Sequence, residues 1–165
     1  MMQVIPQGLA VAYLYHSIPL SMHIEIHDNT TIGEIQEAFS NFYPYLQLEF
    51  YRKPHKKYEA SAAGDLISPE HTIGEIRKTH LSALIEILPL SKVKDVEREF
   101  LQRFGLSVQI SRKEKNKWEQ TTGMDDFTIK ELNEFGRNSS DEYIVSDYDE
   151  GFEEEEGIDE NPLEP

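Results

Sequence analysis

Apolar and polar residues alternate in three short stretches of the chain, and strict alternation is the pattern of a β-strand with one buried face. These stretches are residues 22–27, 45–51 and 106–111. Their apolar positions, which we expect to face the core, are Met22, Ile24, Ile26, Leu46, Leu48, Phe50, Leu106, Val108 and Ile110. Residues 83–88 form a more continuous apolar run, which indicates a central or partly covered strand. A polar turn at 114–116 then predicts a hairpin strand near Trp118.

Four helices are predicted from apolar residues that recur at helical spacing behind a capping residue. Three of them begin with a capping box of the form Thr-x-x-Glu, at Thr31, Thr72 and Thr128. Ser91 is the expected cap of the fourth, which ends at Gly105. The repeated sequence TIGEI suggests internal duplication. However, the segments between the repeats do not match, so we prefer the interpretation that good helix caps resemble one another.

The predicted order of elements is βαβαβαββα, which indicates an α/β or α+β fold. Helices between successive strands favour parallel strand pairs with right-handed crossovers, joined here by one antiparallel hairpin. Because the strands alternate, we expect a mixed sheet of about five strands that carries its helices mainly on one face. The other face of that sheet is then polar and open.

Composition divides the 165-residue chain into three parts, at 1–21, 22–137 and 138–165. The middle part is the predicted domain. The first part is expected to be either a leader ahead of a native start at Met22 or an extra N-terminal strand at residues 11–16, since it lacks the basic residues of a signal peptide. The last part is dense in acidic residues with no Lys or Arg after residue 140, which predicts a disordered acidic tail.

The open polar face is the first candidate binding surface. Its predicted contact residues are Tyr45, Gln47, Glu49 and Tyr51. Within the acidic tail, aromatic side chains are typical of a short docking motif that orders on a partner, and the candidates there are Tyr143, Tyr148 and Phe152.

Two further clusters suggest other chemistry. His23, Glu25 and His27 share one face of a predicted strand, and two imidazoles with a carboxylate form a ligand set for zinc or non-haem iron. The alternative is an ordinary solvated strand face. The second cluster is a basic patch between two tyrosines, which is able to hold phosphates or stack single-stranded bases: Arg52, Lys53, His55, Lys56 and Lys57. The alternatives are an ordinary exposed loop or a docking site for the acidic tail.

The chain contains no motif of nucleophilic or phosphate-transfer catalysis, and it has no cysteine. The absence of cysteine fits a reducing, cytoplasmic compartment. No apolar run reaches the length of a membrane span, roughly 20 residues. We expect neither a cofactor nor a membrane partner, and the oligomeric state is open.

Residues 108–136, VQISRKEKNKWEQTTGMDDFTIKELNEFG, together with IEIHDNTTIGEIQEAFSNFYPYLQLEF near the start, resemble a family of small bacterial α/β proteins that have no assigned activity. The likeness covers residues 22–136. It implies a cytoplasmic bacterial origin and assigns no residue roles.

The function that we expect is therefore a non-enzymatic protein-binding or regulatory module. It would use the open polar sheet face and the acidic aromatic tail to engage a protein with a basic surface. A metal-dependent enzyme centred on His23, Glu25 and His27 is the first alternative. A nucleic-acid binder that uses the loop at residues 51–58 is the second, although the near-balanced charge of the body and the acidic tail both disfavour nucleic acid.

Overall fold

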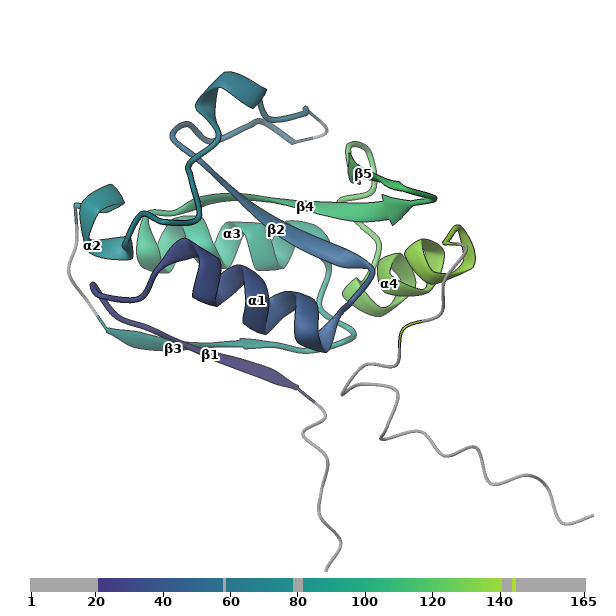
Figure 1. Ribbon diagram of the computed structural model, residues 1–165, viewed down its shortest axis with the longest axis horizontal. Helices are drawn as coiled ribbons and strands as arrows, with labels where there is room; N and C mark the ends of the chain where they lie inside the picture. The colour runs from purple at the N-terminus through teal and green to yellow at the C-terminus, as the bar shows by residue number, and fades with distance from the viewer. Residues whose placement is uncertain (1–20, 58, 79–81, 141–143, 145–165) are drawn as a thin grey trace, which may run out of the picture.

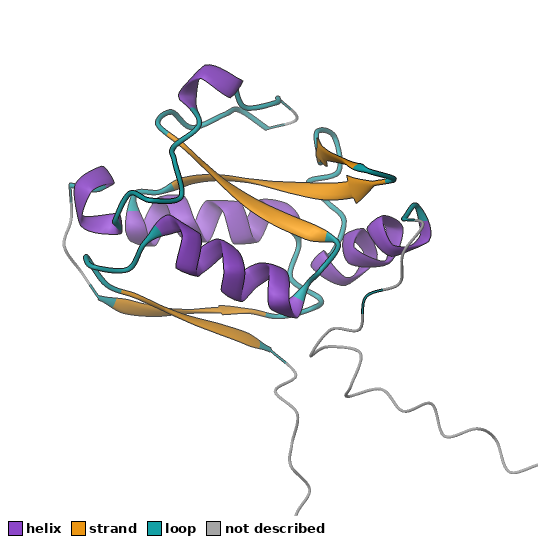
Figure 2. Cartoon of the chain, viewed as in Figure 1, coloured by secondary structure: helices purple, strands orange, loops and turns teal. Residues whose placement is uncertain are grey.

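The computed structural model describes residues 21–57, 59–78, 82–140 and 144. Within them the chain forms five strands and four α-helices (Figures 1 and 2). In chain order these are β1 (Met22–Ile26), α1 (Ile32–Phe42), β2 (Leu46–Tyr51), α2 (Ile73–Ile76), β3 (Ala83–Ile87), α3 (Val93–Phe104), β4 (Ser107–Glu114), β5 (Lys117–Gln120) and α4 (Ile129–Asn138), with a short 3₁₀ helix at Ala63–Asp65.

The strands form two separate antiparallel sheets. β1 pairs with β3 in the smaller sheet, and β4 lies between β2 and β5 in the larger one. Helices α1 and α3 lie between the two sheets (Figure 1). The structure thus confirms the α+β form of the prediction, while the single mixed sheet with parallel pairs is wrong. The reason is that α1, α2 and α3 each connect a strand of one sheet to a strand of the other sheet.

The core lies where the helices meet the two sheets. The strand residues predicted to point inward are all buried there, together with apolar side chains of α1 and α3. The largest fully buried rings on the helices are Phe39, Phe100 and Phe104. Burying such side chains contributes roughly 1.5–3 kcal/mol each, so this layer is the main source of stability.

The helix starts follow the predicted capping boxes at three places. The carboxylates of Glu34, Glu75 and Glu131 accept the N–H groups of Thr31, Thr72 and Thr128 at 2.7, 2.9 and 2.8 Å. The fourth cap was predicted one residue too early. Helix α3 is capped by Lys92, whose side chain makes no capping hydrogen bond. Ser91 lies outside the helix, and its carbonyl accepts the N–H of Ile129 at 2.9 Å.

The starts of α1 and α2 are joined to each other by backbone hydrogen bonds, and so are the starts of α3 and α4. In the first pair, the N–H groups of Ile32, Gly33, Ile73 and Gly74 donate to the carbonyls of His71, Pro69, Thr30 and Asp28. In the second pair, the N–H groups of Val93, Lys94, Ile129 and Lys130 donate to those of Phe127, Asp125, Ser91 and Pro89. The spacing of donors and acceptors is the same in both pairs.

The strand pairings repeat the same relation. Ile24 pairs with Ile85 at the middle of the β1–β3 ladder, and Leu48 with Ile110 is one of the two central pairs of the β2–β4 ladder. An approximate twofold axis near these two centres therefore relates β1–α1–β2–α2 to β3–α3–β4–α4, while β5, between β4 and α4, has no counterpart in the first half. Two halves with the same arrangement are consistent with internal duplication, but the two copies of TIGEI, at 31–35 and 72–76, both lie in the first half, so the resemblance of good helix caps still explains them.

Candidate functional site

The polar face of the larger sheet is not open. Tyr45 and Tyr51 are 0% and 4% exposed, and Gln47 and Glu49 are half-buried. The loop that follows β2 lies on this side of the sheet, away from α1 and α3 (Figure 1). The prediction that these four residues form an exposed binding surface is therefore wrong. Strand alternation predicts the direction in which a side chain points, but not which part of the chain covers it.

A hydrogen-bond network explains why polar side chains are tolerated under this loop. Glu49 accepts from the Ser111 hydroxyl at 2.8 Å and from the Tyr51 hydroxyl at 3.1 Å. Gln120 donates to the Tyr51 oxygen at 3.0 Å and also holds both backbone groups of Ser61 in the loop. Burial, together with the Glu49 carboxylate, raises the pKa of Tyr51 well above its ordinary value. The network fastens the loop over the sheet.

The predicted basic patch does not form one cationic surface. Arg52, Lys53 and Lys56 are exposed, with Lys53 paired to Asp65 at 3.2 Å. Lys57 lies 4.0 Å from Asp126. His55 points inward, where its Nε2 lies 3.5 Å from Oε2 of Glu97 on α3. The five residues thus divide between solvent, acidic neighbours and the interior, which weakens the expectation of a nucleic-acid surface.

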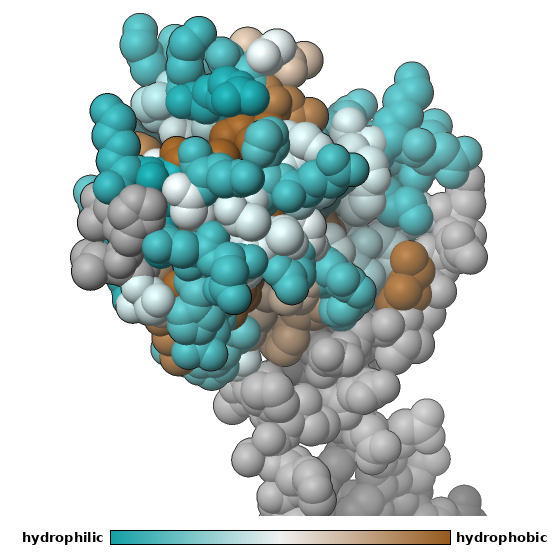
Figure 3. Space-filling view, turned by 60° about the vertical axis from the view of Figure 1, so that its left-hand side comes forward, coloured by the Kyte–Doolittle hydropathy of each residue, from teal (hydrophilic) through white to brown (hydrophobic). Residues whose placement is uncertain are grey.

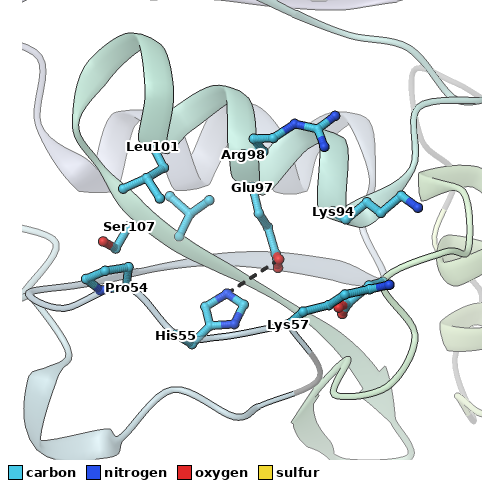
Figure 4. A pocket seen from close by; sticks show the side chains of 10 residues that line it. Pro54, His55, Lys57, Lys94, Glu97, Arg98, Leu101 and Ser107 are labelled. Carbon is cyan, nitrogen blue, oxygen red and sulfur yellow. Dashed lines mark ion pairs between the residues drawn. The ribbon is translucent and has the colours of Figure 1, made fainter.

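His55 and Glu97 line a cavity of about 200 Å³ between the loop and α3 (Figure 4). The Glu97 side chain is 8% exposed, and its Oε1 accepts the Ile110 N–H at 3.0 Å and the Gln109 amide at 3.1 Å. The hydrogen bond to Glu97 raises the pKa of His55 to about 9. At neutral pH this is therefore an ion pair, in which the imidazolium is a proton donor and not a free base.

The cations around this cavity are matched by acids. Lys94 pairs with Asp126, and Arg98 pairs with Asp95. These ion pairs are suited to holding the loop against α3. Because each cation has an acidic partner, the cavity is not suited to binding an anion. Sequence reasoning missed Glu97, although the signal was present: it lies four residues after Val93 and three before Phe100, on the apolar stripe of the helix.

The predicted metal cluster lies on the smaller sheet. His23 Nε2 lies 3.3 Å from Glu86 Oε1, and His27 Nε2 lies 3.3 Å from Glu25 Oε1. Each histidine thus has a carboxylate of its own, and no three His, Asp or Glu side chains converge on a metal position within the described part of the chain. The strand spacing was correct in placing the residues on one side, but the structure does not bring the predicted ligands together.

The outer face of the smaller sheet is exposed, as the alternation predicted for β1. The prediction of a central or partly covered strand at residues 83–88 is wrong, because β3 belongs to a two-stranded sheet and Leu84 is 50% exposed. Its outward side chains are His23 and Glu25 on β1 and Leu84 and Glu86 on β3. The inward residues of β1 pack under the helices. The outer face of this sheet is therefore exposed to solvent and carries two carboxylates.

A groove of about 370 Å³ lies between β1 and α1. Strand β1 contributes His23, Ile24 and Glu25 to it, while Ile35 and Ala38 line the helix side. The outer edge of β1 has no strand partner among the described residues, whose pairings join β1 to β3 alone.

Of the predicted tail, residues 138–140 and Ile144 are described. The hydroxyl of Tyr45 hydrogen-bonds both backbone groups of Ile144, which fixes this point against the body. The other predicted tail contacts, Tyr143, Tyr148 and Phe152, lie outside the described residues. Asn138 ends α4, close to the predicted boundary between domain and tail.

None of the described helices is both long and apolar enough to cross a membrane. No family model matches the chain, and neither a curated protein nor a solved structure matches it. The resemblance of residues 22–136 to small bacterial α/β proteins therefore stays a prediction.

Proposed function

We propose that the protein is a non-enzymatic protein-binding or regulatory module, and that it engages a partner with a basic surface through the exposed β1–β3 sheet. The observation that carries this proposal is an acidic strand face beside an unpaired strand edge. Glu25 and Glu86 are exposed on that face, and the chain has no Lys or Arg before Arg52. We also propose a cytoplasmic location, which fits a chain without cysteine.

Charge supports a partner that is basic. Like-signed carboxylates on one surface raise the rate at which an oppositely charged protein associates, and the acidic tail adds to the same field. Hydrophilic residues cover most of the face shown in Figure 3, where apolar residues appear in small separate areas. On the outer face of the β1–β3 sheet, the exposed Glu25 and Glu86 favour recognition by charge and hydrogen bonds.

The test compares partner capture by three forms of the full-length chain in cell extract, quantified by isotope-labelled mass spectrometry. The first is the wild type, the second is Glu25→Lys with Glu86→Lys, and the third is Glu59→Lys with Glu70→Lys. Both double variants change the net charge by the same amount. Glu59 and Glu70 are exposed and belong to neither strand of the smaller sheet, since they lie in the segment between β2 and α2.

We expect capture of the partner to fall about tenfold in the first double variant and to stay within twofold in the second, since only the first reverses charge at the contact. Binding of the wild type should also weaken as salt is raised. Equal loss in both double variants, or loss in neither, contradicts the proposed surface. Thermal unfolding of each variant verifies that the fold is intact.

A further inference from the structure

We infer that the partner segment binds as a third strand on the free edge of β1, with apolar side chains entering the groove under α1 and basic side chains facing outward beside Glu25. The inference rests on the proposed function and adds the binding mode and the chemistry of the segment. Main-chain hydrogen bonds to an exposed strand edge give such complexes their affinity, and pockets for alternate side chains give them specificity.

The twofold relation of the two halves shows that the open edge of β1 is a particular feature of the first half. At the equivalent edge of β3, Nη2 of Arg103 donates to the Leu84 carbonyl at 3.1 Å. The Arg103 guanidinium also pairs with Glu99, one turn earlier on α3. A charged side chain laid on an edge is a standard means of preventing further strand pairing. The edge of β3 is therefore closed by side chains of its own half.

Among the described residues, no side chain of the first half donates to the edge of β1 in this way. In α1 the positions equivalent to Glu99 and Arg103 are Ala38 and Phe42, and Phe42 is buried against the Tyr43 ring. Ala38 leaves the space that forms the groove beside β1. The two related edges thus differ: Arg103 covers that of β3, whereas its equivalent Phe42 is buried in the core, and a small residue, Ala38, replaces Glu99 beside β1.

The alternation of β1 defines the side chains that an added strand would carry. Residues opposite the inward Ile24 point toward Ile35 and Ala38, so apolar side chains suit them. Residues beside Glu25 point to the outer face, where Glu86 lies on the next strand. Cross-strand pairs of opposite charge stabilise a sheet, so Lys or Arg suits these positions. The segment is therefore extended, about as long as β1, and alternates basic with apolar residues.

The direct test uses a defined peptide, acetyl-KVKVKVK-amide, titrated into the ¹⁵N-labelled full-length protein. We expect chemical-shift changes at residues 22–26 and 34–38 and slower amide exchange at the β1 edge. An acetyl-EVEVEVE-amide peptide should bind at least about tenfold more weakly, since it places carboxylates beside Glu25. The absence of binding by the lysine peptide, or shifts confined to other elements, overturns the inference.

Two controls identify strand addition. In an added strand, only every second N–H group faces β1. Two modified peptides, one N-methylated at all valines and one at all lysines, should therefore differ: one should lose binding and the other should retain it. Ala38→Phe fills the groove and should abolish binding, whereas Asn41→Phe, on an exposed turn of the same helix, should not. Equal effects in either pair contradict the inference. If partner capture still depends on Glu25 and Glu86 in that case, the proposed function stands and only the binding mode fails.

Discussion

At the scale of single residues, the difference between Gln36 and Glu97 is the most informative. The two occupy equivalent positions of α1 and α3, and each satisfies the backbone of the strand beneath it: Gln36 donates to the Leu48 carbonyl at 2.7 Å, and Glu97 accepts from the Ile110 N–H at 3.0 Å. A neutral amide is sufficient for this role in the first half. The buried carboxylate in the second half is stabilised by protonated His55, so its charge holds the long loop in place.

This ion pair makes part of the stability depend on pH. The pKa of His55 is raised from 6.5 to about 9 by the hydrogen bond to Glu97. A histidine whose pKa is higher in the folded state contributes its stabilisation fully below the unfolded value, and the contribution is lost as the pH rises through about 9. We expect Glu97→Gln to lower the free energy of unfolding by about 1.5–3 kcal/mol at pH 6. The difference from the wild type should shrink by pH 10, as measured by urea unfolding.

Titration of the His55 ring by NMR provides the control for this prediction. Its midpoint should fall from about 9 in the wild type to near or below 6.5 in Glu97→Gln, because burial of the ring then acts without a compensating carboxylate. An unchanged midpoint would show that Glu97 is not the cause of the raised pKa.

The sequence predicted parts of this site but not their contacts. His55 was singled out because it lies among lysines, and that neighbourhood suggested an exposed position. Its actual environment depends on Glu97, 42 residues further along the chain (Figure 4), and no local pattern predicts such a contact. Likewise the alternation of residues 45–51 showed correctly that Tyr51 and Glu49 share a face, while the cover over that face depends on the contact between Gln120 and Ser61.

At the scale of elements, the four helix starts are variations of one capping unit. Thr31, Thr72 and Thr128 are N-caps of capping boxes, while the fourth position, Lys92, has no side-chain capping bond. Because the backbone pairs 31 with 72 and 92 with 128 in the same way, the four sites offer equivalent environments. The sequence predicted the three boxes since a box is local; it misplaced the fourth cap because Lys92 carries no capping signal.

Restoring the missing cap should stabilise the protein. We expect Lys92→Thr to raise the free energy of unfolding by about 0.5–1 kcal/mol, because its hydroxyl can accept the N–H at Asp95, as Thr31 accepts that of Glu34 at 3.2 Å. The reverse change, Thr31→Lys, should lower the free energy of unfolding by about 1 kcal/mol. Urea unfolding of both variants checks the pair. Equal destabilisation by both would show that Lys92 has a role that the capping argument omits.

Strand pairing is the element-level feature that sequence could not supply. The order of strands and helices is compatible with one mixed sheet, and crossover rules favour parallel neighbours when strands share a sheet. Here α1 and α3 pass the chain across the core, so β1 and β2 lie in different sheets and each finds its partner in the other half. That pairing is seen only in the contacts between the two halves, and the repeated TIGEI does not predict it, because its two copies, at 31–35 and 72–76, both lie in the first half.

At the scale of the whole molecule, the two halves present related surfaces that differ in their side chains. The smaller sheet has two outer edges related by the twofold axis. In the half that carries Arg103 the edge is closed, and in the other half, among the described residues, the edge has no strand partner and lies beside a groove. The proposed strand addition would therefore use one of two related edges.

This view predicts that a second binding edge can be opened by substitution. Glu99→Ala with Arg103→Ala removes the side chains that close the edge of β3 and leaves small residues on that face of α3, as Ala38 does on α1. Both side chains are about one-third exposed or more, and such exposed pairs contribute only about 0–1 kcal/mol to stability, so the fold should tolerate their loss.

Calorimetric titration of this variant with the lysine–valine peptide should then give two peptides per chain in place of one. Ala38→Phe added to this variant should return the stoichiometry to one by blocking β1. A variant that still binds one peptide would show that the Arg103 contact does not close the β3 edge, and that the openness of β1 has another cause.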